Sequence, residues 1–390
     1  MHGLGVVTIA AAFGWIALAL AGLGIAYTCA CAIIVRRFFS AAPDVSQASE
    51  PVTILKPLFG EEPQLYENLH SFLAQDHGCQ VQVLCGIADR RDSAAPVVAQ
   101  LAENYPRSVA LVVDGQHHGG NRKVSNLINI LRHADHSTVV LSDSDILVEP
   151  DYLAHVLNAL RQPNVGAATC LHRGRGDNGF WSVLGAAGLS YQFLPDALFA
   201  SITGLAKPCM GSTIAIRQET LNLVGGLESV ANCLADDYAI GERVRALGKQ
   251  IAVPRMLVVH CLSDGSMAEL CHHELRWGVT LREISLLAHV FSVIRMPFPL
   301  ALLGMITNPG VGALVALTAF FARWLLVAEV DRAAGESSAP AVLLPLRDCL
   351  SFVIHLSSLV PKTVLWRGIR LRVAANGKIF SPRWPLSGAQ

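Results

Sequence analysis

An almost uninterrupted apolar run over residues 6–35 most constrains how this chain can fold, and it ends at Arg36 and Arg37. Roughly 20 apolar residues suffice for a helix to cross the hydrocarbon core of a bilayer. The run is longer than the core of a signal peptide and shows no convincing small-residue cleavage site. We therefore expect a transmembrane helix over residues 1–37, with the two arginines keeping the residues that follow in the cytoplasm.

The composition of the 390-residue chain also indicates a membrane protein. Only 15% of its residues are charged, whereas soluble domains average about a quarter. The 30 basic residues balance the 30 acidic ones, so no nucleic-acid partner is expected. The ten cysteines include no C-x-x-C pair, which indicates neither a zinc site nor a disulfide framework.

Polar residues 38–51 are expected to form a linker, and a different pattern begins at Val52, where short apolar runs alternate with helical segments. The expected strands cover residues 52–55, 81–88, 109–113, 138–142, 165–171 and 212–216, and the expected helices cover 64–75, 94–104, 121–133 and 180–194. The alternation predicts a parallel sheet flanked by helices, in an α/β domain over residues 52–262. Ligands of such sheets bind beyond the carboxyl ends of the strands.

One of these strands delivers two carboxylates to its carboxyl end. Three apolar residues run into Asp143-Ser144-Asp145, and three more follow it. Charged side chains in such apolar surroundings are costly unless they are paired or bind a metal. Two carboxylates this close can share a divalent cation that keeps phosphate oxygens as further ligands. A D-x-D triplet is a weak signal by itself, and its weight depends on the rest of the chain.

A second acidic pair, Asp236 and Asp237, begins a helix that is expected to reach about residue 247. Acidic residues in the first turn of a helix serve as caps or compensate the helix dipole. One carboxylate would meet that need, so two adjacent ones indicate a further role.

The chain after residue 262 is expected to return to the membrane. An amphipathic interfacial helix over residues 263–293 carries His273-Glu274-Leu275-Arg276-Trp277. Apolar stretches follow at 297–306, 312–330 and 341–366, and we assign residues 294–366 to a C-terminal transmembrane region. The first stretch is short and contains proline, which suits a re-entrant or interfacial piece. The third contains charged residues that must face protein or water. Three or four spans are possible, and the basic tail over residues 367–390 favours the cytoplasm.

The order of these motifs resembles that of processive-type family-2 glycosyltransferases. Within that superfamily, the chain is most similar to ceramide glucosyltransferases, and more closely to bacterial hopanoid-biosynthesis-associated glycosyltransferases. The motifs that carry the resemblance are 54–58 (ILKPL), 123–127 (KVSNL), 143–146 (DSDI), 225–227 (GGL), 234–238 (LADDY) and 273–277 (HELRW). The likeness covers about residues 6–366. It implies a GT-A-like nucleotide-sugar-binding domain with a mixed, mainly parallel sheet and transmembrane helices at both ends.

For donor binding, the resemblance assigns the nucleotide base or ribose to Asp89 or Asp92. We favour Asp92, and a solvated turn is the alternative for either residue. Asp143 matches the family's second aspartate and Asp145 the metal ligand of the D-x-D arrangement, with Mg²⁺ or Mn²⁺ bridging the diphosphate. Lys123 is expected to reach phosphate or base, although an ordinary first-turn helix lysine is an equally good interpretation of its local sequence.

For catalysis, the resemblance makes Asp237 the general base that deprotonates the acceptor hydroxyl, with Asp236 as the less favoured candidate. Arg276 would bind the diphosphate and Trp277 would form a flat wall for donor or acceptor. The alternative is a helix whose aromatic and basic residues anchor at lipid headgroups. The family carries Gln or Arg where this chain has His273, a departure that predicts a pH-sensitive site.

The expected function is transfer of N-acetylglucosamine from a UDP-sugar to a hopanoid such as bacteriohopanetetrol, with inversion. The expected location is the bacterial inner membrane, with several passes and the catalytic domain in the cytoplasm. A ceramide glucosyltransferase that uses UDP-glucose is the alternative that stays open. A polysaccharide synthase would need more spans, and a non-catalytic membrane scaffold would not need every acidic motif. The sequence gives no indication of the oligomeric state.

Overall fold

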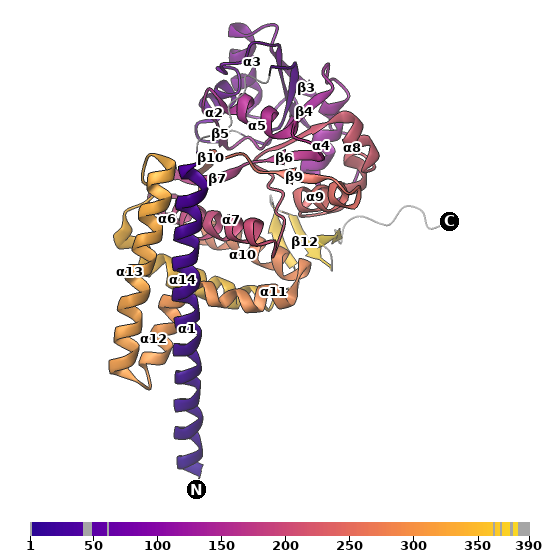
Figure 1. The fold of residues 1–390 in the computed structure, drawn as a ribbon. Coiled ribbons are helices and arrows are strands. Elements are labelled where there is room, and N and C mark those ends of the chain that lie inside the picture. The colour runs from indigo at the N-terminus through magenta and orange to yellow at the C-terminus, as the bar shows by residue number, and fades with distance from the viewer. Residues whose placement is uncertain are drawn as a thin grey trace.

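The computed structural model describes residues 2–41, 49–60, 62–361, 363–366, 369–374 and 377–380. The N-terminal apolar run forms a single long helix, α1 (His2–Ser40), which extends from the body of the molecule as a rod (Figure 1). Three helical segments within the described ranges are long and apolar enough to cross a membrane: Ala10–Ser40, Pro309–Ala334 and Ala341–Ser358. A bent pair, Leu286–Arg295 with Pro297–Met305, would make a fourth if it counts as one span.

The alternating segment forms a seven-stranded sheet with the order β3-β2-β1-β4-β8-β6-β9. Its strands are β1 (Val52–Pro57), β2 (Val81–Ile87), β3 (Val109–Val113), β4 (Thr138–Leu141), β6 (Val165–Thr169), β8 (Ile214–Arg217) and β9 (Gln250–Ala252). Four pairings are parallel and the two that involve β8 are antiparallel. The prediction of a mixed, mainly parallel sheet is therefore confirmed.

Helices cover both faces of this sheet, which explains why its strands are apolar without alternation. The covering and connecting helices are α2 (Leu65–Ser71), α3 (Ala95–Asn104), α4 (Arg122–Leu131), α5 (Tyr152–Leu160), α8 (Gln218–Leu223), η2 (Leu227–Val230) and α9 (Asp236–Ala246). Successive residues of one strand point to opposite faces, so Ile54 belongs to one hydrophobic cluster and Leu55 to the other. The carboxyl end of the central strand β4 is thus held rigidly from both sides.

A second, three-stranded sheet contains β5 (Ile146–Leu147), β10 (Leu257–Leu262) and β7 (Leu171–Gly176), in that order. The chain passes from the large sheet to this one between β4 and β5, and again at Cys170 between β6 and β7. The prediction of one strand over residues 165–171 was therefore wrong: two strands meet there and belong to different sheets. The D-x-D triplet lies in the seam between the two sheets.

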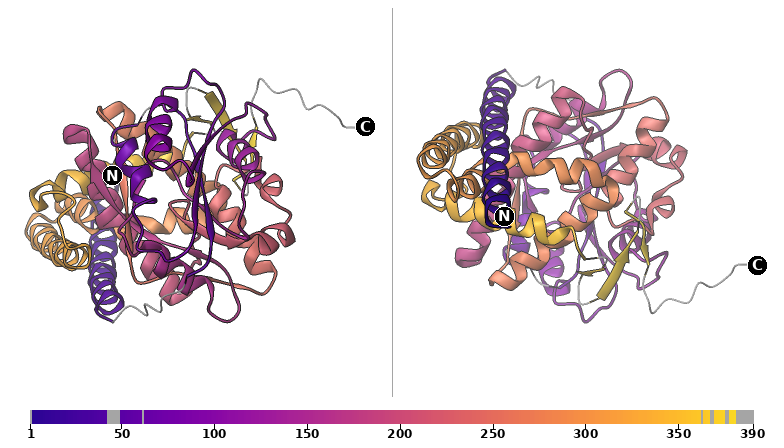
Figure 2. Two further views of the ribbon diagram at one scale, coloured as in Figure 1. Left: turned by 90° about the horizontal axis from the view of Figure 1, so that it is seen from above. Right: turned by 90° about the horizontal axis from the view of Figure 1, so that it is seen from below.

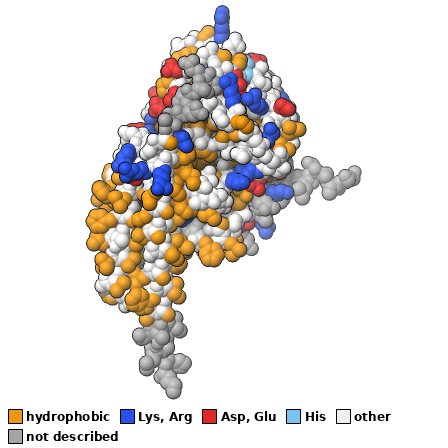
Figure 3. Space-filling view, viewed as in Figure 1, with side chains coloured by type: hydrophobic (Ala, Val, Ile, Leu, Met, Phe, Trp, Pro, Cys, Tyr) orange, Lys and Arg blue, Asp and Glu red, His pale blue; other side chains and the backbone are white. Residues whose placement is uncertain are grey.

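Further helices lie below the two sheets and beside α1 (Figures 1 and 2). They are α6 (Gly179–Gly188), η1 (Leu189–Phe193), α7 (Leu194–Thr203), α10 (Met267–Ile284), α11 (Leu286–Phe291) and η3 (Ser292–Arg295). Next come α12 (Pro297–Met305), α13 (Pro309–Ala334), η4 (Ala341–Leu343) and α14 (Leu344–Ser358). Hydrophobic side chains gather over α1, α12 and α13, whereas most acidic and basic ones gather above them, over the part that holds the two sheets (Figure 3).

The third apolar stretch, predicted over residues 341–366 as part of the membrane region, is not one helix. Helix α14 ends at Ser358, and β11 (Thr363–Trp366) pairs with β12 (Ile369–Val373), which pairs with β13 (Ile379–Phe380). The apolar side chain of Val364 packs instead with Val279 of α10 and Leu234, next to the second acidic pair. An apolar strand buried against a helix has the same hydropathy as a membrane segment, which explains the error.

Candidate active site

A cluster of charged side chains lies at the carboxyl end of β4. It centres on Lys123, in the first turn of α4. Its Nζ lies 2.7 Å from Asp143 Oδ1 and 3.7 Å from Asp236 Oδ2. Burial alone would lower the pKa of Lys123, but the carboxylates of Asp143 and Asp236 outweigh it and raise the pKa. The lysine therefore stays charged and holds together two motifs that are 93 residues apart in the sequence.

The two acids of the second pair have different surroundings. Asp236 is buried, lies beside Lys123 and accepts a hydrogen bond of 3.3 Å from Asn121 Nδ2. Asp237 instead accepts hydrogen bonds from backbone amides, those of Gly211 (2.9 Å) and Tyr238 (2.7 Å). Burial and the neighbouring Asp236 raise the pKa of Asp237 to about 6. Asp236 is thus an anchor for the lysine, while Asp237 has the proton affinity of a general base that works near neutral pH.

Gly211, in the loop before β8, lies between these side chains. A Cβ added there would come within 3.3 Å of both Asp237 Oδ2 and Lys123 Nζ, and within 3.6 Å of Asp143 Oδ2. The three side chains therefore converge on one point, and only glycine leaves that point open. Gly211 could not be identified from the sequence, because nothing local marks it: its contacts come from α4, from the end of β4 and from α9.

Asp145 lies on the other side of the seam and faces β10. Its Oδ2 lies 3.1 Å from His260 Nε2. Burial would raise the pKa of Asp145, but the adjacent His260 outweighs it, and the pKa is lowered. His260 was also missed, although it is a titratable residue inside the apolar strand β10, a signal that could have singled it out.

The described residues fit a divalent cation bound jointly by protein and substrate. The second carboxylate oxygen of Asp145, Oδ1, is buried and has no hydrogen-bond partner. No group of three or more His, Cys, Asp or Glu side chains in the described part of the chain is arranged to hold a metal ion alone. Oxygen ligands suit Mg²⁺ and Mn²⁺, which commonly take substrate phosphate oxygens to complete their coordination.

A buried lysine donates hydrogen bonds to the start of the D-x-D triplet and to the residue before it. The side chain of Lys56, on β1, is fully buried and its Nζ donates hydrogen bonds to Asp143 O (2.8 Å) and Ser142 Oγ (3.0 Å). The same Nζ lies 3.4 Å from the centre of the Phe72 ring. Burial lowers the pKa of Lys56 to about 7. Lys56 was part of a quoted motif, but the sequence assigned it no role.

The two aspartates after β2 have different partners and different exposure to solvent. Asp92 Oδ1 accepts hydrogen bonds of 2.9 Å from the backbone amides of Gly60 and Ala94, so it ties the loop after β1 to the loop after β2. Asp89 is exposed and pairs with Arg91 at 2.6 Å, which lowers its pKa to about 2. Asp92 is therefore built into the edge of the sheet, whereas Asp89 belongs to a solvated turn.

The motif on α10 joins the site through aromatic rings. The ring of Trp277 lies 4.4 Å from that of His273 and 6.4 Å from that of His260, measured between centroids. His273 Nδ1 lies 3.3 Å from Asp264 Oδ2. Trp277 thus connects the membrane-side helix to the histidine that contacts Asp145. Arg276 is half-buried on the same helix.

His172, on β7, extends this group of rings. Its ring lies 5.5 Å from that of His260 and stacks on Phe193 at 4.8 Å. Its Nδ1 is buried without a hydrogen-bond partner, and burial lowers its pKa to about 3. The rings of Phe193, His172, His260, Trp277 and His273 form a wall, which we call the ring wall, on the membrane side of Asp145.

Comparisons with known proteins identify relatives of this chain. A ceramide glucosyltransferase from Caenorhabditis elegans (Ceramide glucosyltransferase 3) is 24% identical over 85% of this chain and 74% of its own length. A second protein from that organism, Ceramide glucosyltransferase 1, is 23% identical over 62% of this chain and 52% of its own.

Among solved structures, a mannosyltransferase from Pyrobaculum calidifontis, in complex with GDP-Man and Mn²⁺, matches 89% of this chain and 98% of its own with a TM-score of 0.52 at 22% identity. That likeness confirms the GT-A-like fold. The model of Glycosyl transferase family 21 matches residues 15–379. This chain is therefore a glycosyltransferase, and it belongs to glycosyl transferase family 21.

Proposed function

We propose that this protein moves a sugar from a UDP-sugar to a hydroxyl group of a membrane lipid, with inversion at the anomeric carbon. The observation that carries the proposal is the convergence of Lys123, Asp143 and Asp237 on the open point at Gly211. Lys123 can pair with a diphosphate, and Asp143 can bind the divalent cation that neutralises it. Asp237 can take a proton from an acceptor.

Asp237 is the proposed general base. Its raised pKa, set by burial and by Asp236, lets it take the proton of the acceptor hydroxyl as that oxygen attacks the anomeric carbon. A single displacement by an oxygen activated in this way inverts the configuration, so an α-linked donor gives a β-glycoside. Asp236 acts indirectly, because it shares Lys123 with Asp143 and lies next to the base.

The donor diphosphate is proposed to lie between Lys123, Asp143 and Asp145, with Arg276 of α10 as a further cation. Mg²⁺ or Mn²⁺ held by the two aspartates would neutralise the diphosphate and stabilise the departing nucleotide. The similar mannosyltransferase was solved with GDP-Man and Mn²⁺, which supports the proposal of a nucleotide-sugar donor and a divalent cation. Asp92, rather than Asp89, is proposed to position the nucleoside, because it organises the loops beside the ends of β1 and β2.

The two sheets that carry the site and the described part of the tail contact each other, so we place them on one side of the membrane. Leu234 N donates to Gly377 O at 2.8 Å and Ile379 N to Asn232 O at 2.9 Å, so the tail contacts the loop just before Asp236. The segments between Asp237 and Gly377 must therefore cross an even number of times. We propose that this shared side is the cytoplasm of a bacterial cell, as Arg36 and Arg37 favour.

Helices α12 and α13 are proposed to form a re-entrant hairpin beside a single crossing by α1. Gly24 of α1 lies against Ile294, just before α12, and Gly14 lies against Thr307, in the turn between α12 and α13. The two glycines are ten positions apart, which corresponds to a rise of about 15 Å along the helix, roughly half of a hydrocarbon core. The 72° bend between η3 and α12 fits a segment that enters the bilayer and returns.

The proposed acceptor is a hopanoid such as bacteriohopanetetrol and the proposed sugar is N-acetylglucosamine, as the motif resemblance implies. Glucose transfer to ceramide is the second candidate, and the names of the curated relatives favour it. A polysaccharide synthase fits less well, because a growing polymer needs a channel through more spans than this chain offers. A non-catalytic scaffold would not preserve the cluster around Gly211.

The proposal is tested with purified protein in lipid nanodiscs, Mn²⁺, and either UDP-N-acetylglucosamine or UDP-glucose. Each donor is paired with bacteriohopanetetrol and with ceramide, and lipids are analysed by mass spectrometry. A glycolipid whose formation stops in Asp237→Asn while UDP binding persists would support it. Turnover that is unchanged in Asp237→Asn would refute the assignment of the base.

A further inference from the structure

The C-terminal sheet, formed by β11, β12 and β13, pairs with the loop that leads into the second acidic pair. Residues 377–379 run antiparallel to residues 232–234 of this loop. Two backbone hydrogen bonds join the segments, Leu234 N to Gly377 O at 2.8 Å and Ile379 N to Asn232 O at 2.9 Å. Helix α9 begins at Asp236, directly beyond this pairing. The tail therefore fixes the chain immediately before the proposed base.

The same loop is joined to the N-terminus of α4, the helix that carries Lys123. Asn121 is fully buried and caps α4 with its side chain, and its Nδ2 donates to Cys233 O of the loop at 2.8 Å. The side chain of Ile379 lies over Gly120, where an added Cβ would come within 3.4 Å of it. The tail, the loop and the start of α4 therefore form one packed unit next to Lys123.

The C-terminal sheet also packs against α10, the helix that carries Arg276 and Trp277. Val279 follows Trp277 closely on this helix and belongs to a cluster of buried apolar side chains. The other buried members of the cluster come from the loop and from the sheet: Leu234, Val364, Leu371, Val373 and Ile379. The sheet therefore lies between α10 and the loop and contacts both.

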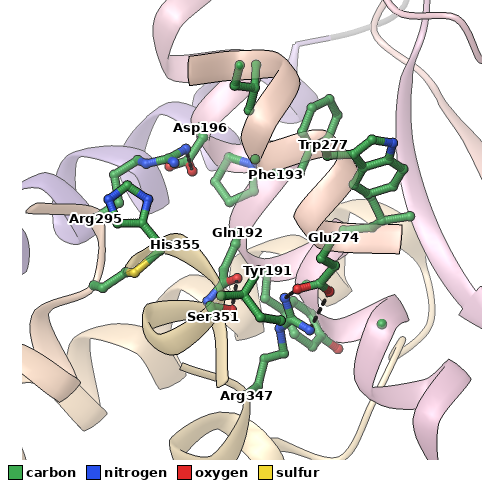
Figure 4. Close-up of a pocket in the computed structure, with 18 of the residues that line it drawn as sticks. Tyr191, Gln192, Phe193, Asp196, Glu274, Trp277, Arg295, Arg347, Ser351 and His355 are labelled. Carbon is green, nitrogen blue, oxygen red and sulfur yellow. Dashed lines mark hydrogen bonds and ion pairs between the residues drawn. The ribbon is translucent and has the colours of Figure 1, made fainter. Parts of the chain in front are cut away.

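Helix α10 is itself fixed against α14. Arg282 of α10 donates to Ser358 O and Pro361 O, both at 2.7 Å, where α14 ends and the tail begins. Nearer the start of α10, Glu274 pairs with Arg347 of α14 at 2.6 Å, on the same helix as Trp277 (Figure 4). Helix α10 is thus a rigid support, and the C-terminal sheet connects it to the loop before the acidic pair.

We propose that the C-terminal sheet positions Asp237 relative to Trp277, and that Ile379 is the main positioning residue. Ile379 joins all three parts: its backbone pairs with the loop, its side chain lies over Gly120, and it belongs to the cluster with Val279. A misplacement of about 1 Å can lower turnover on the order of 100-fold. The inference rests on the proposed function in taking Asp237 as the base.

The test measures kcat per UDP-binding site in nanodiscs, so that misfolded protein does not count. In Ile379→Ala this value should fall about 10–100-fold, while the Kd for UDP with Mn²⁺ changes less than about threefold, because β4 and β10 hold Asp143 and Asp145. Ile379→Val should keep at least about half of the activity. Lys378→Ala is the control on the same strand, since its side chain is exposed. Leu101→Ala, a buried truncation in α3, controls for destabilisation.

A cross-link tests the pairing itself. Cys233 faces Lys378 in a non-hydrogen-bonded antiparallel pair, in which Cα atoms typically lie about 4.5 Å apart, within the range of disulfides. Oxidation of Lys378→Cys with copper phenanthroline should therefore join Cys233 to the introduced cysteine, as mass spectrometry would show. In the double variant with Ile379→Ala, this bond should recover most of the lost kcat. The oxidised unmodified protein controls for reaction at other cysteines.

Hydrogen exchange adds a measurement that needs no turnover. Amides of residues 232–240 should exchange at least about tenfold faster in Ile379→Ala and at the original rate in Lys378→Ala. The proposal would be overturned by unchanged exchange or unchanged kcat per site in Ile379→Ala, by an equal loss of kcat in Leu101→Ala, or by a cross-link that does not form or restores nothing. Failure of the proposed function would appear separately, as full turnover in Asp237→Asn or as no glycolipid from the unmodified protein.

Discussion

Protonation of Asp237 should set the acidic limb of the pH–rate profile. Burial and Asp236 raise its pKa from 3.8 to about 6, and a general base works only when deprotonated. At pH 5 about a tenth of the protein would then carry the ionised base, whereas a carboxyl with its ordinary pKa would be about nine-tenths ionised. Activity should therefore fall roughly tenfold between pH 8 and pH 5 and stay lost at lower pH.

The assay is kcat/KM for transfer from the UDP-sugar, measured from pH 4.5 to 8.5 with UDP binding followed in parallel. In Asp237→Asn, kcat should fall by about 10²–10⁴ while UDP still binds, because the amide oxygen can accept the bond from Gly211 N. His273→Gln separates the other candidate for pH sensitivity: the acidic limb should remain in it. A limb that vanishes in His273→Gln, or activity at pH 5 above half its maximum, would show that protonation of Asp237 does not limit the rate.

Further substitutions test the parts of the site that surround this base. Gly211→Ala should lower kcat about tenfold or more with little change in stability, since its Cβ would crowd Asp237 and Lys123, whereas full activity would contradict the convergence. His260→Asn should raise the Kd for Mn²⁺, measured by calorimetry with UDP present, by about 10–100-fold. Lys56→Met should lower the free energy of unfolding by about 1–3 kcal/mol in denaturant titrations, because Ser142 and Asp143 O lose their buried donor. A green fluorescent protein fused to the C-terminus should fluoresce in a bacterial host, and a dark, full-length fusion would place the tail outside.

Much of the large sheet could be predicted because its strands and helices have local signatures. The runs that became β1 to β4, and the helices between them, follow from apolar patterning alone, and Asp143 was recognised from its place after a buried strand. The helical expectation for residues 180–194 was correct but too short, because the helix continues through η1 and α7 to Thr203. Its apolar face packs against α1 and α13, which no local pattern reveals.

The parts of the fold and of the site that could not be predicted depend on pairings between distant segments. The seam that holds Asp145 exists because β5 pairs with β10, more than a hundred residues later, and this pairing also brings in His260. Gly211 and Lys56 are similarly defined by contacts from other elements. The strand β11 was taken for membrane because hydropathy cannot distinguish burial in protein from burial in lipid. The sequence thus identified charged motifs, and the fold determined which of their members share one site.

The structure of the product tests inverting transfer to a lipid most directly. Purified protein is incubated with ¹³C-labelled UDP-N-acetylglucosamine or UDP-glucose and with either bacteriohopanetetrol or ceramide in nanodiscs. The lipid product is then identified by mass spectrometry, and its anomeric configuration by nuclear magnetic resonance. We expect a single sugar joined to a lipid hydroxyl in the β configuration, and no such product in Asp237→Asn. An α-linked product, or release of UDP with free sugar as the only product, would contradict it.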